Sequence, residues 1–297
     1  MFTIVTDTSA NLPTPMAKEA GLLVLPFTYT IDGKTYAAED TEAFDGVSFY
    51  EKIRRGMLVT TSLINVQAYL DHFTSLAESG QDILFISMSS GISGSYNAAV
   101  VASRQIREEY PSVTIKTLDT MGASLGEGLI ALHAAKLQKE GKSLEETYQS
   151  CRDMCLHMGQ VFTVDSLMHL RRTGRCSNAK AAIGTVLNIK PLLKGNEMGQ
   201  IVTYGQVRGR RKSLLALAKS YEEHVQDPEN QTIGIAHADC IDDAVYLIRL
   251  LKQTKHPPKD VLTVMYEPVT GSHVGPGTLA LFFLGNENVR SLKMPEI

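Results

Sequence analysis

The chain has 297 residues, of which 29 are basic and 32 acidic, and its formal net charge is −3 at pH 7. A chain with this balance has no overall positive field, so we exclude nucleic acid as its main partner. Its hydrophobic content of 43% and charged content of 21% are those of an ordinary globular protein, and its length is sufficient for two domains.

Strand and helix patterns alternate in the first half of the chain. Residues 2–6 alternate apolar residues with threonine, and residues 83–86 form an apolar run typical of a buried strand. Further strands are expected over 22–31, 34–37 and 113–118, and helices over 13–21, 47–55, 66–77, 96–110, 122–140 and 144–157. Strands that alternate with helices favour a parallel sheet with helices on both faces, and thus an α/β domain.

Polar residues mark where several of these helices begin. Asp45 and Asn65 can each cap the helix that follows, and Ser143 with Glu146 forms a capping box. Residues 59–62, VTTS, lie between two predicted helices, and we expect them in a loop.

The rhythm changes from about residue 160. Short strands are expected over 161–164, 189–194, 201–207, 232–237, 260–266 and 278–284, with helices over 210–226 and 241–254. Strands that pair locally and mix with helices favour an α+β fold with a mixed or antiparallel sheet. We therefore predict an α/β domain over residues 1–160 and a second, α+β domain over residues 161–297.

Neither membrane insertion nor metal binding is expected. No apolar run approaches the roughly 20 residues that span a bilayer, so we expect no integral membrane segment. The N-terminus, MFTIVTDTSANLP, lacks the basic and then apolar segments of a secretory signal. Cys151 and Cys155 could form a metal pair, but the sequence has no second pair nearby. We expect reduced thiols in a cytoplasmic protein, and no metal site.

The most informative stretch follows the predicted strand at 83–86. Ser89–Ser95, SSGISGS, is a loop of small hydroxyl residues and glycines, and a helical pattern begins directly after it. A loop at the carboxyl end of a strand, followed by a helix, is where α/β proteins bind anions, because free backbone N–H groups of the helix point out of it. We infer that this loop binds the acidic head of a small ligand.

Two other loops carry hydroxyl groups, Asp7-Thr8-Ser9 and Thr60-Thr61-Ser62. The carboxyl ends of parallel strands share one edge of a sheet, so all three loops could converge in one crevice. The structural alternative is that these residues are helix caps and turn formers.

His273 lies in a predicted loop rich in glycine and proline, Gly271–Gly277. It is either a solvated loop residue or a donor to an anionic group. Neutral hydroxyls with one imidazole suit a carboxylate better than a polyphosphate, which favours lysine, arginine and Mg²⁺.

A serine esterase or other hydrolase is the alternative function. Gly91-Ile92-Ser93-Gly94 resembles a nucleophile elbow, but Ser95 stands where that motif requires glycine. Ser93 could be the nucleophile and His273 its base, although the sequence identifies no particular carboxylate that would orient the histidine. We therefore favour this function less than ligand binding.

Two basic segments have several interpretations. Leu170–Arg175, LRRTGR, reads as a basic turn that could bind phosphate, face a partner or have no role. Gln206–Lys212, QVRGRRK, is the densest positive patch; such a run is usually a solvated face, and the alternative is a docking site for a partner that handles phosphate.

Taken together, these segments resemble the DegV family nearly end to end. Its signatures match in order: IVTDTSANLP at 4–13, Thr61-Ser62, Ser89–Tyr96, Leu170–Ser177 with Leu187–Leu192, and HVGPG at 273–277. The chain departs from the family at two places. Leu63-Ile64 follow Thr61-Ser62 where the family usually has glutamine and proline, and Gly209 replaces a threonine often seen in the arginine-rich patch.

The resemblance implies a bacterial, cytoplasmic lipid-binding protein with a role in lipid transport or fatty acid metabolism. A long-chain fatty acid such as palmitate or oleate would be buried in a tunnel between two domains, with no cofactor. The resemblance places its carboxylate on the hydroxyls of Thr61, Ser62 and Ser93, the Gly94 backbone and His273.

Arg175 and Arg208 fall where the family carries arginines, and we expect them to contact the head group or a partner. Some family members present the acid to a separate fatty acid kinase, which makes the acyl phosphate. The resemblance therefore implies that this chain is itself not an enzyme.

Overall fold

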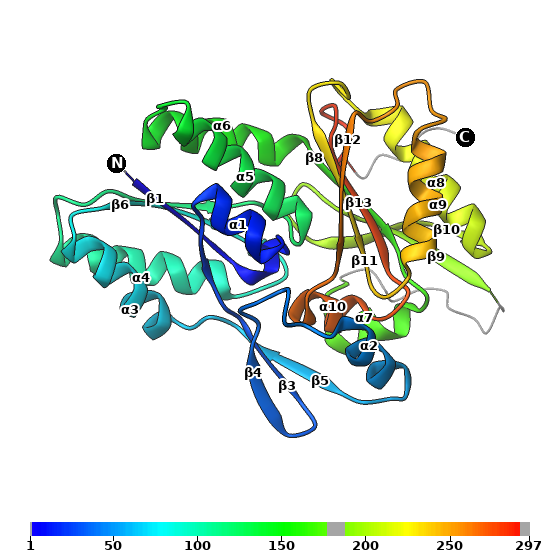
Figure 1. Cartoon of the computed structure of the whole chain (residues 1–297), viewed down its shortest axis with the longest axis horizontal. Helices are drawn as coiled ribbons and strands as arrows, with labels where there is room; N and C mark the ends of the chain where they lie inside the picture. The colour runs from blue at the N-terminus through cyan, green and yellow to red at the C-terminus, as the bar shows by residue number, and fades with distance from the viewer. Residues whose placement is uncertain (1, 177–187, 292–297) are drawn as a thin grey trace. The chain divides into compact units, whose positions relative to one another are not determined.

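The computed structural model describes residues 2–176 and 188–291 (Figure 1). The family signature expected around residues 170–192 thus lies partly outside the described residues, with Ser177 and Leu187 among those left out. The chain divides into two compact units. The first unit comprises Met1–Phe44 and Leu58–Cys155, and the second comprises Asp45–Met57 and Leu156–Ile297.

The first unit is built on a parallel sheet of four strands in the order β2-β1-β6-β7. These strands are β1 (Phe2–Asp7), β2 (Leu23–Leu25), β6 (Asp82–Ser87) and β7 (Ile115–Asp119). The helices are α1 (Thr14–Ala20), α3 (Val66–Glu78), α4 (Ser95–Glu109), α5 (Leu125–Lys139) and α6 (Leu144–His157), with a short 3₁₀ helix, η1, at Thr8–Ala10. Figure 1 shows α1 and α5 on one face of this sheet and α3 and α4 on the other. The predicted α/β fold of this part of the chain is confirmed.

Local sequence explains these elements. The apolar stripe of α3 packs onto the sheet: the rings of Tyr69 and Phe73 lie 5.1 and 5.8 Å from the ring of Phe85 in β6. The predicted caps are present, because Asn65 Oδ1 accepts the Ala68 N–H at 2.9 Å and Ser143 exchanges hydrogen bonds with Glu146. Amphipathic spacing and capping together therefore fix where these helices form.

A second, three-stranded sheet in the first unit corrects two expectations. The strand expected over 22–31 is interrupted at Pro26, which has no N–H for a sheet ladder and directs the chain away from β2. The chain continues in an antiparallel sheet of β3 (Thr28–Ile31), β4 (Lys34–Ala37) and β5 (Val59–Ser62). The loop expected at 59–62 is wrong: these β-branched residues form β5, where Thr61 pairs with Tyr29.

The second unit has a mixed sheet of six strands in the order β10-β9-β8-β13-β11-β12, in which β11 and β12 are parallel and the other neighbours antiparallel. The strands are β8 (Met158–Thr163), β9 (Ile189–Gly195), β10 (Ile201–Arg208), β11 (Thr232–His237), β12 (Asp260–Met265) and β13 (Leu279–Leu284). The helices are α2 (Gly46–Arg54), α7 (Leu167–Thr173), α8 (Arg210–His224), α9 (Ile241–Leu251) and α10 (Pro268–Val274). The predicted mixed sheet is confirmed, and within it β9 and β10 form an antiparallel hairpin.

The helix α2 is grouped with the second unit although it lies early in the chain. Asp45 caps it as expected, by accepting the Ser48 N–H at 3.0 Å. Its apolar side chains Phe49, Tyr50 and Ile53 are buried. The domain limits of 1–160 and 161–297 stay a prediction, and the compact units differ from them by this excursion and by a start at Leu156.

The segment around His273 also differs from expectation. The predicted glycine-proline loop is helical over Pro268–Val274, so His273 lies in the last turn of α10. Glu267 caps this helix, since its carboxylate accepts the N–H groups of Val269 and Thr270, each at 2.5 Å. Proline at the first helical position assists, because its fixed φ suits a helix start.

Candidate functional site

The strands of the parallel sheet place several loops at one edge. β1, β6 and β7 end at neighbouring positions, and the turn after β7 is bonded to the loop after β6. The Ser89 N–H donates to the Gly122 carbonyl at 2.7 Å, and the Ser90 N–H donates to the Asp119 carboxylate at 3.3 Å. The Ser89–Ser95 loop is therefore held by its neighbours at the carboxyl edge of the sheet.

Hydrogen bonds within the loop set the position of Ser93. The Ser93 N–H donates to the Ser89 carbonyl at 3.1 Å, and its Oγ accepts the Ser95 N–H at 3.2 Å. Ser95, the first residue of α4, is buried and bonded to the Tyr69 hydroxyl at 2.7 Å. Ser93 is half-buried and Gly94 exposed, so both precede a helix whose N-terminal dipole favours a negative charge.

The end of β5 lies beside this loop. A Cβ built on Gly94 would be 3.3 Å from Cδ2 of Leu63, the residue that directly follows Ser62. Leu63, one of the departures from the family pattern, therefore packs against Gly94. The structure thus brings the strand that carries Thr61 and Ser62 to the loop that carries Ser93 and Gly94.

The third hydroxyl-bearing loop, Asp7-Thr8-Ser9, has a structural role instead. Thr8 Oγ1 accepts the Phe27 N–H at 3.0 Å, which joins the chain after β1 to the residue before β3. Ser9 is fully buried and bonded to two carboxyl groups, those of Asp7 and Glu127. For Asp7-Thr8-Ser9 the turn-forming interpretation is therefore the correct one.

Both of these buried carboxyl groups lie within hydrogen-bond distance of the Ser9 hydroxyl. Ser9 Oγ lies 2.5 Å from Asp7 Oδ1 and 2.6 Å from Glu127 Oε2, and Thr6 Oγ1 donates to Glu127 Oε1 at 2.9 Å. A serine hydroxyl has one proton to donate, so one carboxyl must donate to Ser9 in turn. Burial, and then the charge of Asp7, raises the pKa of Glu127 well above its usual range. Glu127 is therefore the partner that holds a proton more readily.

In the second unit, α7 holds the helix that carries His273. His169 Nε2 is bonded to the Ser272 carbonyl, and Thr173 Oγ1 donates to the His273 carbonyl at 3.4 Å. The pKa of His273 is lowered to about 4, first by burial and then by the positive charge of Arg175 and by His169. The imidazole is therefore neutral near pH 7 and has one N–H to donate.

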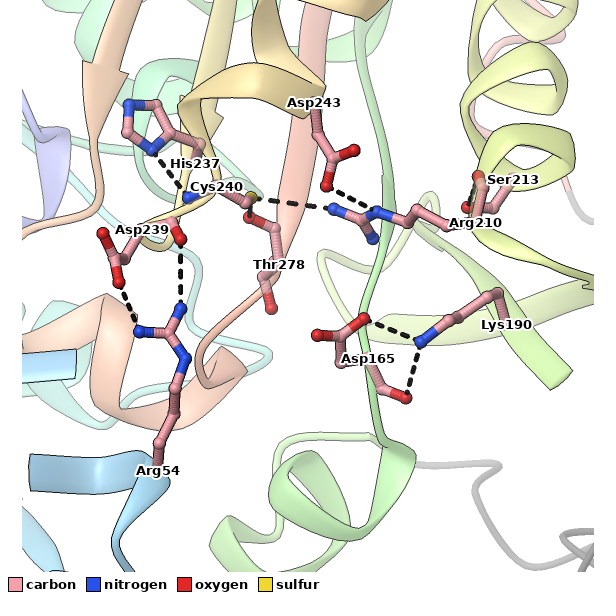
Figure 2. A network of polar contacts seen from close by, with 10 residues as sticks. All are labelled: Arg54, Asp165, Lys190, Arg210, Ser213, His237, Asp239, Cys240, Asp243 and Thr278. Atoms are coloured by element: carbon pink, nitrogen blue, oxygen red, sulfur yellow. Dashed lines mark hydrogen bonds and ion pairs between the residues drawn. The ribbon is translucent and has the colours of Figure 1, made fainter. Parts of the chain in front are cut away.

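The structure thus brings Arg175 near His273 but gives no such contact for Arg208. Arg208 ends β10 and is exposed, and in the part of the chain that the structure describes no hydrogen bond or ion pair joins it to either residue. Its neighbour Arg210 is not on a solvated face. Figure 2 shows its guanidinium directed at Asp243. The Nε donates to the Asp243 carboxylate at 2.8 Å, and the side chain is 19% exposed. The basic segment 206–212 is therefore partly structural.

Neither the cysteines nor the acidic residues form a metal site in residues 2–176 and 188–291, where no cluster of three or more candidate ligands occurs. Cys151 and Cys155 are buried, and the Cys155 Sγ donates to the Cys151 carbonyl at 3.1 Å. Burial raises the pKa of Cys151 to about 12, so this thiol is not ionised at neutral pH. Within the same residues, no helix has both the length and the apolar character required to cross a bilayer.

Sequence reasoning missed two residues next to the candidate site. Glu127 lies within the helix predicted over 122–140, and it is the one charged residue of the apolar stretch at the start of α5. A charged residue in such a stretch indicates a buried polar partner, because burying an unpaired charge is costly. Tyr69 lies within the helix predicted over 66–77, and its hydroxyl bonds Ser95 at the start of α4. The hydroxyl of a buried tyrosine indicates a nearby hydrogen-bond partner, because such hydroxyls are usually paired.

Comparisons with known proteins agree along the whole chain. A family model described as "Uncharacterised protein, DegV family" matches residues 1–286. A DegV domain-containing protein of Clostridium perfringens is 39% identical over 285 residues, which cover 96% of this chain and 98% of that protein.

Solved structures of similar proteins contain or are described as binding fatty acids. A DegV family protein of Ruminococcus gnavus, solved with vaccenic acid, has a TM-score of 0.85 at 26% identity and covers 95% of this chain and 99% of its own. A fatty acid binding DegV family protein of Streptococcus agalactiae has a TM-score of 0.83 at 29% identity, with 96% and 99% covered. The fold and the ligand class of these relatives are thus consistent with the hydroxyl-bearing loops described above.

Proposed function

Because the chain belongs to the DegV family, we propose that it binds one long-chain fatty acid, such as palmitate or oleate. The observation that supports this most directly is the packing of Leu63 against Gly94. It brings the end of β5, the strand that carries Thr61 and Ser62, to the loop that carries Ser93 and Gly94, and neutral donors at a helix N-terminus suit a carboxylate.

We assign the fatty acid carboxylate to five groups: the hydroxyls of Thr61, Ser62 and Ser93, the backbone of Gly94, and the imidazole of His273. The low pKa of His273, about 4, supports this assignment because it leaves a neutral N–H donor at physiological pH. Arg175, whose charge acts on His273, contributes positive potential to the head group, and Arg208 is assigned to the head group or to a partner.

The acyl chain supplies most of the affinity in this proposal. Each methylene removed from water contributes about 0.8 kcal/mol, so a chain of palmitate length gains far more from an apolar tunnel than from its head group. The polar groups then determine the orientation of the ligand and select a carboxylic acid.

We further propose that the protein acts in the bacterial cytoplasm in lipid transport or fatty acid metabolism, and that it presents the carboxylate to a separate kinase for acyl-phosphate formation. In that reaction the kinase supplies ATP, Mg²⁺ and catalysis, whereas this chain desolvates and orients the acid. It would have no catalytic residue or cofactor of its own.

Native mass spectrometry of the purified protein tests the proposal. An adduct of fatty-acid mass, or uptake of added oleate, supports a carrier. A protein that stays empty in the presence of oleate contradicts it. The alternative function, a serine esterase, predicts a different result. Incubation with a fatty acyl ester should give turnover, and Ser93→Ala should abolish that turnover.

Removing single hydroxyls should weaken oleate binding selectively. We expect Thr61→Val and Ser93→Ala each to cost about 1–3 kcal/mol of binding free energy, the usual scale for a hydrogen bond to a charged group. Thr60→Val is the matched control, because Thr60 is the neighbour of Thr61 in β5 and is assigned no contact with the carboxylate. Titration of each variant with oleate measures the effect, and unchanged affinity in both site variants would refute the assignment.

A further inference from the structure

The helix α2 is held in the second unit by two polar anchors, Tyr50 and Arg54. The Tyr50 side chain is fully buried, and its hydroxyl donates to the Tyr266 carbonyl at 2.8 Å. Burial, and then the charge of Glu267, raises the pKa of Tyr50 well above its usual range. The phenol therefore stays a hydrogen-bond donor at every physiological pH.

Tyr50 touches α10 as well as the strand before it. A Cβ built on Gly271 would overlap the Tyr50 hydroxyl, so the backbone of α10 approaches α2 more closely than any other residue type would allow. On a helix, a residue two positions further on is rotated by about 200°. His273 is therefore on the side of α10 opposite the side that meets Tyr50.

A second group of contacts comes from α7. The side chain of His169 is bonded to the Ser272 carbonyl, and a Cβ built on Gly275 would be 2.7 Å from the His169 ring. The helix α10 thus has Tyr50 against Gly271 and His169 against Gly275. A shift of α10 in the neighbourhood of His273 has to break one of these contacts.

Arg54 provides the other anchor of α2. Figure 2 shows its guanidinium directed at Asp239, where it pairs with the carboxylate and donates to the main-chain carbonyl at 3.0 Å. Asp239 has a φ of 53°, in the left-handed region, in the loop after β11. The end of β11, directly before this loop, is bonded to the residue that anchors Tyr50, because the Tyr266 N–H donates to the His237 carbonyl at 2.9 Å.

We propose that α2 is a positioning element for His273, with Tyr50 as the residue that fixes α10 and Arg54 as the residue that fixes α2 on the loop after β11. The inference rests on the proposed function, because His273 is taken there as a ligand of the fatty acid carboxylate. It adds that Tyr50, which is assigned no contact with the ligand, controls how well the imidazole N–H is placed.

The test is a double-mutant cycle on oleate affinity. We expect Tyr50→Phe, which removes only the hydroxyl, to weaken oleate binding about tenfold, the scale of a lost buried hydrogen bond. In a His273→Ala background the same substitution should change the affinity by less than about twofold, since the group that it positions is gone. Equal losses in both backgrounds would mean that Tyr50 only supports the fold, and would overturn the proposal.

Arg54 gives a second comparison that does not depend on a buried residue. Arg54→Gln should weaken oleate binding by a smaller factor, about threefold, because the anchor is partly exposed. Arg55→Ala is its matched control: Arg55 is the next residue, its side chain is 76% exposed, and its ion pair is with Glu51 of the same helix. Equal affinities of the Arg54 and Arg55 variants would count against the second anchor.

NMR titration of the His273 imidazole separates this inference from the proposed function. In Tyr50→Phe the pKa of His273 should move from about 4 toward its ordinary value of 6.5, because a displaced α10 exposes the ring. If wild-type protein ignores oleate, or His273→Ala binds it normally, the proposed function fails and this titration alone decides. A shifted pKa then still supports positioning by α2, and an unchanged pKa refutes it.

Discussion

Replacing Glu127 by glutamine is expected to stabilise the first unit by about 3 kcal/mol at pH 7 to 8, whereas most buried substitutions destabilise. Glutamine preserves the pattern of hydrogen bonds of a protonated glutamate: its amide N–H can donate to Ser9 and its oxygen can accept from Thr6. Unlike glutamate, it takes up no proton when the chain folds.

The sign of the effect follows from the raised pKa values. Burial raises the pKa of Asp7 from 3.8 to about 6, and that of Glu127 well above its usual 4.5. The folded protein therefore binds more protons than the unfolded chain once the pH exceeds these ordinary values, and its stability falls as the pH rises toward the folded-state pKa. Each such proton costs about 1.4 kcal/mol for every pH unit.

Urea unfolding followed by circular dichroism between pH 5 and 8 measures this effect. Wild-type protein should lose stability across that range more steeply than Glu127→Gln. Glu140→Gln is the control, because Glu140 directly follows α5 but has a side chain that is 49% exposed. If the wild type and Glu127→Gln show the same dependence on pH, Glu127 does not take up a proton when the chain folds.

Replacing Arg290 by alanine is expected to lower the free energy of unfolding of the second unit by about 3–5 kcal/mol. Arg290 is 2% exposed although it lies near the end of the chain. Its Nη1 donates to the Met158 carbonyl at 3.0 Å, and its Nη2 and Nε donate to the Asn196 carbonyl at 2.8 and 3.2 Å. Alanine would leave a cavity and two buried carbonyls without these donors.

Thermal unfolding compares this variant with Arg249→Ala, which removes an exposed arginine from α9. The control should unfold at nearly the wild-type temperature. Arg290→Lys should recover part of the loss, since an ammonium group can reach one carbonyl but lacks the fork that reaches two. Similar losses for Arg290→Ala and Arg249→Ala would show that the buried guanidinium contributes little.

Local signals in the sequence predicted the elements of both units well. Helix caps at Asp45, Asn65 and Ser143 were readable because capping depends on residues three positions apart. The alternation of strands and helices was sufficient for the parallel sheet. The pairing of β9 with β10 agrees with two predicted strands that are close neighbours in the chain.

The incorrect predictions of secondary structure occur where one or two residues override the local sequence pattern. Pro26 interrupts an apolar run that otherwise reads as one strand. Glu267 and Pro268 start a helix in a segment whose glycines favour a loop, so the capping of α10 outweighs the composition of residues 271–277. The helical pattern of α2 was correct, but its assignment to the second unit depends on which core buries Phe49 and Tyr50, and no local pattern contains that information.

The candidate site was predictable to a similar degree. The loop at Ser89–Ser95 was found because it follows a buried strand and precedes a helix. The argument that all three hydroxyl loops meet at one sheet edge was right for the loops after β1 and β6. It could not apply to Thr61, which belongs to the separate sheet of β3, β4 and β5. Leu63, just after that strand, is the residue that packs against Gly94.

The early position of α2 in the chain has a consequence for biosynthesis. The ribosome makes Phe49, Tyr50 and Ile53 well before it makes β12 and α10. The apolar face of this helix therefore stays unburied until those later elements have been synthesised. The second unit cannot close in the order in which it is translated. Its core is therefore completed only after α10 has been synthesised.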